Sequence, residues 1–145
     1  MVIGGNTPPH TYLGMAMAYK NGFEALHAVG GNVAIPSNYL VAHALECALK
    51  AFLSRDGDDA RLRQPDIRHN LTELWTLSGS EGLTLESPVP DWVERLGSLY
   101  GAPYHLRYAT GVNGLVMPNS DVVVAGARYV IDLVWLEITG SPHHS

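Results

Sequence analysis

A polar stripe interrupts the apolar segment between residues 36 and 57. His43, Glu46, Cys47 and Lys50 lie three, four and seven positions apart along it, which places them on one side of an α-helix. Two interpretations are open. In the first, this stripe forms the wall of a pocket, where Lys50, held by Glu46, contacts an anion. In the second, Glu46 and Lys50 form an ordinary ion pair four positions apart, and Cys47 is a small buried side chain.

A second candidate group is Arg68-His69-Asn70, directly before a predicted helix. The free N–H groups at the start of a helix attract anions and disfavour a cationic imidazole. His69 can therefore act as a neutral hydrogen-bonding group or general base beside an anion site, with Arg68 next to it. The alternative is that His69 only helps to begin the helix or packs at the surface.

A third candidate group is the segment 104–108, which reads Tyr-His-Leu-Arg-Tyr. An aromatic ring beside a guanidinium can stack on a nucleic-acid base while the guanidinium contacts a phosphate. Arg107 and Tyr108 are therefore predicted ligand contacts. The alternative is a packed connector whose tyrosines fill the core and whose arginine pairs with a carboxylate.

The composition limits the classes of function. The chain has 145 residues, 46% of them apolar, with a net charge of −5 and one cysteine. A broad basic surface for duplex DNA is not expected. A disulfide and a Cys-rich zinc site are excluded, and we predict no metal and no cofactor. The chain has neither an apolar stretch of roughly 20 residues nor a signal-peptide pattern, so we expect no membrane association and a cytoplasmic location.

The elements that position these residues are predicted to be five helices in a single domain, residues 1–145, with flexible tails at 1–11 and 139–145. A charged connector is expected at 56–66. An antiparallel up-and-down bundle is the simplest packing of four to five such helices, so the predicted fold class is all-α. The expected helices span about 12–29, 37–56, 66 or 70 to 77, 91–100 and 120–138.

The last of these helices is apolar almost all round. The pair Arg128 and Asp132, four residues apart, favours a helix over a strand for this valine-rich segment. Its valines also motivate a third functional alternative, a non-catalytic dimerisation or protein-interaction module. We expect the interaction surface to contain Val122, Val123, Val130 and Val134.

The segment 37–52 resembles the central helix of HEPN-domain proteins, which is alanine-rich and ends in a Leu-Lys-Ala-aromatic run, here Leu49-Lys50-Ala51-Phe52. A helix with the pattern His-Asn-Leu follows at His69, and an Arg-Tyr pair follows later at 107–108. The order and spacing of these three pieces match that family over residues 36–108.

The resemblance implies a bundle of four or five helices, often a homodimer, associated with RNA or nucleotides. It also implies a toxin–antitoxin, defence or stress context, with a nucleotidyltransferase or antitoxin as possible partner. In such a domain, a nucleotide or single-stranded RNA would be bound by Glu46, Lys50, Arg68, His69, Arg107 and Tyr108.

Many HEPN proteins are metal-independent endoribonucleases with an Arg followed after four to six residues by a His near the last main helix. Here Arg128 has no such His, and the only literal match, Arg63 with His69, lies before the third predicted helix. We therefore favour a non-catalytic or degenerate domain. The enzymatic alternative uses His69 as the catalytic residue with Arg63 or Arg68.

Overall fold

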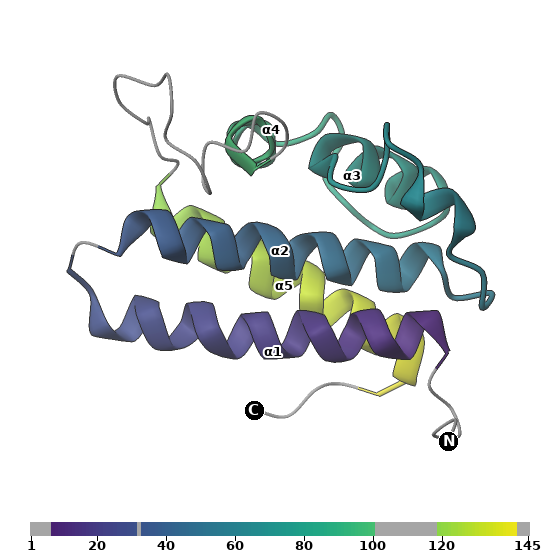
Figure 1. Ribbon diagram of the computed structural model, residues 1–145, viewed down its shortest axis with the longest axis horizontal. Coiled ribbons are helices and arrows are strands. Elements are labelled where there is room, and N and C mark those ends of the chain that lie inside the picture. Colours follow the sequence, from purple (N-terminus) through teal and green to yellow (C-terminus); the bar gives the residue numbers. More distant parts are fainter. Residues whose placement is uncertain (1–6, 32, 101–118, 142–145) are drawn as a thin grey trace.

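The computed structural model describes residues 7–31, 33–100 and 119–141, and the regular secondary structure in these residues is entirely helical (Figure 1). No strand occurs in these residues, which confirms the predicted all-α class. The helices are α1 (Pro8–Val29), α2 (Ala34–Leu53), α3 (Leu71–Ser80), α4 (Asp91–Tyr100), α5 (Ser120–Thr139) and a short 3-10 helix, η1 (Ala60–Arg63).

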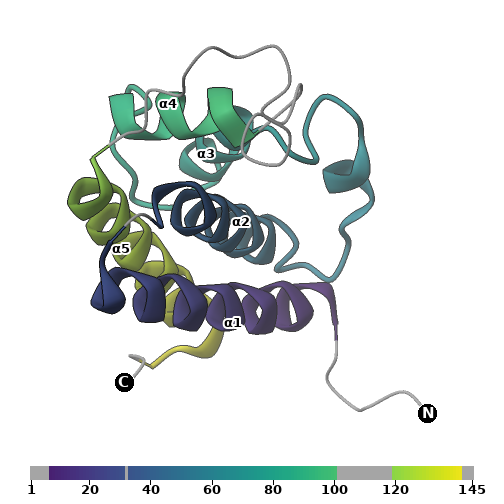
Figure 2. The ribbon, with the colours of Figure 1, turned by 60° about the vertical axis from the view of Figure 1, so that its left-hand side comes forward.

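Helix α2 is the central element. It contacts α1, α3, α4 and α5, and Figure 2 shows it between α1 on one side and α3 and α4 on the other. Ala44, Ala48 and Ala51 are fully buried along it, because small side chains allow neighbouring helices to approach closely. In Figure 1, α1 and α2 form an antiparallel pair, whereas α4 is viewed end-on and so crosses α2.

The helix boundaries correct the sequence prediction at the N-terminus. Pro8 and Pro9 form the first turn of α1 rather than preceding it, since a proline there lacks only an N–H that has no helical partner. Residues 8–11, expected in a tail, are therefore helical. The predicted bounds of α4 are confirmed, and α3 begins after Asn70, whose side chain accepts a hydrogen bond from Glu73 N at 3.1 Å.

The valine surface predicted for α5 is wrong. Val123, Val130 and Val134 are at most 1% exposed, and only Val122, at 50%, faces solvent. These valines are buried because α5 packs against α1, α2 and α4. The guanidinium of Arg128 also binds Glu24 of α1 rather than the expected Asp132.

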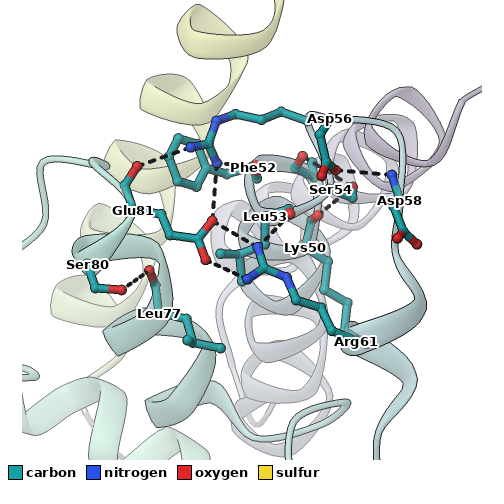
Figure 3. A network of polar contacts seen from close by, with 12 residues as sticks. Lys50, Phe52, Leu53, Ser54, Asp56, Asp58, Arg61, Leu77, Ser80 and Glu81 are labelled. Atoms are coloured by element: carbon teal, nitrogen blue, oxygen red, sulfur yellow. Dashed lines mark hydrogen bonds and ion pairs between the residues drawn. The ribbon is translucent and has the colours of Figure 1, made fainter.

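The connector between α2 and α3 is held by an exposed arginine (Figure 3). Arg61 donates to both carboxylate oxygens of Glu81, at 2.6 and 2.8 Å, and to the Leu53 carbonyl at 2.9 Å. Because Leu53 ends α2 and Glu81 follows α3, this arginine ties the two helix ends together. The chain between them, which contains His69, is thereby held over α2.

None of the helices in the described part of the chain combines the length and the apolar character needed to cross a membrane.

Candidate functional site

Three of the predicted site residues meet at one buried carboxylate. Glu46 Oε2 accepts a hydrogen bond from Lys50 Nζ at 2.9 Å, and Glu46 Oε1 contacts His69 Nδ1 at 3.0 Å. The side chains of Glu46 and Lys50 are only 5% and 8% exposed, whereas that of His69 is 32% exposed. Because a carboxylate only accepts, His69 donates from Nδ1 to Glu46, and part of its ring remains at the surface.

Two further side chains complete this arrangement. The hydroxyl of Tyr100 donates to Glu46 Oε1 at 2.7 Å, and His43 Nδ1 lies 2.6 Å from the same hydroxyl. Since the tyrosine proton points at Glu46, His43 must donate from Nδ1 to the tyrosine oxygen. We refer to His43, Glu46, Lys50, His69 and Tyr100 as the Glu46 cluster.

The cluster holds Glu46 in its charged form. Burial alone raises the pKa of this carboxyl, but the Lys50 charge and the hydrogen bonds from His69, Tyr100 and Lys50 outweigh it, so the pKa lies below its ordinary value of 4.5. Burial, followed by the neighbouring Glu46 charge, raises the pKa of Tyr100. The tyrosine therefore stays a hydrogen-bond donor at all physiological pH values.

Aromatic rings enclose the cluster. Tyr19 packs edge-on against His43 with ring centroids 4.3 Å apart. The ammonium of Lys50 lies 5.9 Å from the ring centroid of Tyr12, whose hydroxyl donates to Asp59 at 2.9 Å. Burial and this hydrogen bond raise the pKa of Tyr12 to about 12. The Glu46 and Lys50 side chains are thus largely covered, at 5% and 8% exposed, whereas 32% of the His69 side chain stays accessible.

The ion-pair interpretation of Glu46 and Lys50 is confirmed, with the difference that the pair is buried. Lys50 therefore neutralises Glu46, and its low exposure argues against a direct phosphate contact. Cys47 is a buried small side chain, 2% exposed. Burial raises the pKa of its thiol to about 12, so it is chemically inert at neutral pH.

The predicted arginines differ in their surroundings. Arg68 is exposed, and its backbone N–H donates to the Gln64 carbonyl at 2.9 Å, but its guanidinium makes no hydrogen bond or ion pair within the described ranges. Arg63 binds Asp59 at 3.2 Å, with 68% of its side chain exposed. Arg107 and Tyr108 lie outside the described residues. Arg63 and Arg68 are the two arginines proposed to act with His69. Of these, Arg68 is the sequence neighbour of His69, and it is not paired with a carboxylate of the described chain.

Tyr100 was not among the candidate residues predicted from the sequence. Tyr100 is 1% exposed and reaches Glu46 across 54 positions of sequence. A signal for it does exist, because a carboxylate on a helix that is buried all round requires several donors. That rule predicts a donor from another element but does not identify which one.

Among the described residues, no group of three or more His, Cys, Asp and Glu side chains is arranged so that it could hold a metal ion.

Comparison of the chain with known protein families, with characterised proteins and with solved structures gives no match. The resemblance to HEPN domains therefore depends on the residues quoted for it, and the functional conclusion depends on the geometry of the Glu46 cluster.

Proposed function

We propose that this protein is a HEPN-like helical domain that binds the phosphate of a nucleotide or single-stranded RNA beside His69. The observation that carries the proposal is the hydrogen bond from His69 Nδ1 to the buried carboxylate of Glu46, at 3.0 Å. It fixes the ring in one orientation with 32% of the side chain exposed. A ring oriented before binding loses less conformational entropy when a ligand binds.

Arg68 supplies the charge for this site. Its planar guanidinium donates two parallel hydrogen bonds to phosphate oxygens, and it neighbours the oriented ring in the turn before α3. Lys50 acts differently from its role in the sequence prediction, because it keeps Glu46 charged inside the core instead of touching the ligand. Arg107 and Tyr108 retain their proposed roles, phosphate contact and stacking on a base.

The experiment is fluorescence anisotropy with a labelled single-stranded RNA of about eight nucleotides and with unlabelled nucleotides as competitors. Arg68→Ala is compared with Arg95→Ala, which removes the same charge from an exposed position on α4, where Arg95 pairs with Asp91 at 2.7 Å. We expect Arg68→Ala to weaken binding about 3- to 10-fold, as for a lost charged hydrogen bond, and Arg95→Ala to change it by less than about twofold.

Equal weakening by the two arginine variants would indicate a non-specific charge effect and would contradict the site. Absence of binding by the unsubstituted protein to every nucleotide and RNA tested would contradict the function itself.

A second candidate function is a metal-independent endoribonuclease. The pairing of Glu46 with His69 favours it, because a carboxylate that holds Nδ1–H leaves Nε2 as the basic nitrogen of the neutral ring. In this reaction Nε2 takes the proton of a ribose 2′-hydroxyl, the 2′-oxygen attacks the adjacent phosphorus, and the 5′-oxygen leaves. Arg68 would stabilise the charge on the pentacoordinate phosphorus.

Cleavage is tested by incubating RNA with the protein in EDTA and comparing it with the His69→Ala variant. This second candidate predicts fragments that end in a 2′,3′-cyclic phosphate and the loss of these fragments in the variant. Equal cleavage by both proteins excludes His69 as the catalytic group.

A further inference from the structure

A concave region lies between α3, α4 and α5, and it shares no residue with the Glu46 cluster. It is a pocket of about 460 Å³ whose aromatic walls are Trp75, Trp92 and Tyr129. This volume falls in the range of about 300–1,000 Å³ typical of small-molecule sites. The pocket remains accessible because Tyr129 and the neighbouring Val122 are 57% and 50% exposed.

The two tryptophan walls are fixed in place. Trp75 and Trp92 have centroids 5.8 Å apart and ring planes at 89° to each other. Trp92 lies so close to the backbone of α5 that a Cβ added at Gly126 would be 2.3 Å from its Cζ2. The indole N–H of Trp75 donates to the Glu86 carbonyl at 2.9 Å. The walls are therefore already formed without a ligand.

The electrostatic character of this pocket is negative. Glu86 is the charged residue among the described side chains that line it, and these include no Lys, Arg or His. The Glu86 carboxylate makes no hydrogen bond or ion pair to another described residue. Trp75 is only 4% exposed, so the ring surface comes mainly from Tyr129 and Trp92. Aromatic faces carry a partial negative charge, so these rings and one carboxylate attract a cation and disfavour an anion.

We propose that this aromatic pocket binds a small organic cation that carries a quaternary ammonium group. Such a group has no N–H to donate and is weakly hydrated, so it does not require hydrogen-bond acceptors in the pocket. It is stabilised by contact with aromatic faces. A strongly hydrated metal ion or an anionic nucleotide does not fit this lining. The proposal is independent of the phosphate site at His69.

The test uses isothermal titration of the full chain with choline and with its neutral isostere, 3,3-dimethylbutan-1-ol. The two probes have the same shape and differ in charge at the central atom. We expect choline to bind at least about fivefold more tightly than the alcohol, as for a cation–π contact. Equal binding of the two probes, or no binding of choline, would overturn the proposal.

Variants locate the binding at this pocket. Tyr129 is exposed, so its substitution leaves the fold intact. We expect Tyr129→Ala to weaken choline binding by about fivefold and Tyr129→Phe, which keeps the ring, to change it by less than about twofold. Glu86→Gln should lower the affinity for choline and leave the affinity for the alcohol unchanged. An unaltered choline affinity in Tyr129→Ala would place the bound cation elsewhere and contradict the proposal.

Discussion

Glu46 and Glu81 are both carboxylates that accept hydrogen bonds from several donors, yet they lie in opposite environments. The side chain of Glu46 is 5% exposed and contacts Lys50, His69 and Tyr100. That of Glu81 is 28% exposed and contacts Arg61 and Arg55. The pKa of both carboxyls is lowered. At Glu46, burial raises the pKa, but the Lys50 charge and the hydrogen bonds to the carboxylate outweigh this effect. At Glu81, the main cause is the hydrogen bonding from Arg61.

The difference shows that the number of contacts does not set their importance. Water can replace the partners of Glu81, so breaking its ion pairs costs little free energy. Water cannot reach Glu46 to the same extent, so removing one partner leaves a buried charge without compensation. The exposed network fixes the course of a connector, whereas the buried one fixes the orientation of His69.

The largest effect is expected for Glu46→Ala, which leaves the Lys50 ammonium buried and two donors without an acceptor. The free energy of unfolding should fall by about 3–5 kcal/mol, measured by urea denaturation. The double variant Glu46→Leu with Lys50→Met removes both charges and should recover most of this loss. A loss below about 1 kcal/mol in Glu46→Ala would show that the cluster is solvated and would remove the contrast with Glu81.

The pH dependence tests the same contrast. Because the pKa of Glu46 is lowered by folding, its contribution to stability is complete above its ordinary value of 4.5 and is lost as pH falls through the lowered value. Urea denaturation between pH 7 and pH 3 should show this loss, and Glu46→Gln should show a shallower one. Parallel curves for the two proteins would assign the acid sensitivity to other carboxylates.

Two helical glycines extend the comparison to uncharged contacts. A Cβ at Gly126 would overlap Trp92, whereas one at Gly14 would meet no atom within 4 Å apart from its chain neighbours and its own helix backbone. Gly126→Ala should therefore destabilise the protein by about 1–3 kcal/mol. Gly14→Ala should stabilise it by up to about 1 kcal/mol. Thermal melts of both variants measure the difference, and equal melting temperatures would contradict the close packing of Trp92.

The smallest effect is expected for Glu81→Ala. Although it removes two ion pairs, the free energy of unfolding should change by at most about 1 kcal/mol, because both arginines are exposed and water replaces the carboxylate. Urea denaturation in low and high salt measures this, and salt should reduce the difference further. A loss as large as that of Glu46→Ala would show that exposure does not separate the two carboxylates.

Local sequence signals were sufficient for much of the fold. Asn70 and Asn119 cap α3 and α5 with their side chains, and capping residues followed by an apolar pattern predict helix starts. The sequence also predicted that three site residues lie close together. Helical spacing places Glu46 and Lys50 one turn apart, and the order of motifs that resembles HEPN domains adds His69. The sequence did not determine whether Lys50 faces a ligand or Glu46.

Long-range packing accounts for the errors. Tyr100 has the pattern of an apolar core residue, and its hydrogen bond to Glu46 depends on how α4 crosses α2. The valines of α5 were expected at the surface because their pattern is apolar all round, and such a pattern does not reveal which helices cover it. The aromatic pocket likewise joins residues of three helices and has no signature in any one segment.

The central claim is that a buried Glu46 orients the ring of His69. Long-range ¹H–¹⁵N NMR of the histidine rings at alkaline pH tests it most directly, because it identifies which nitrogen of the neutral ring is protonated. The geometry predicts Nδ1–H for His69, donated to Glu46, and Nδ1–H for His43, donated to Tyr100. An Nε2–H form of His69 would show that Glu46 does not hold the ring and would contradict the account.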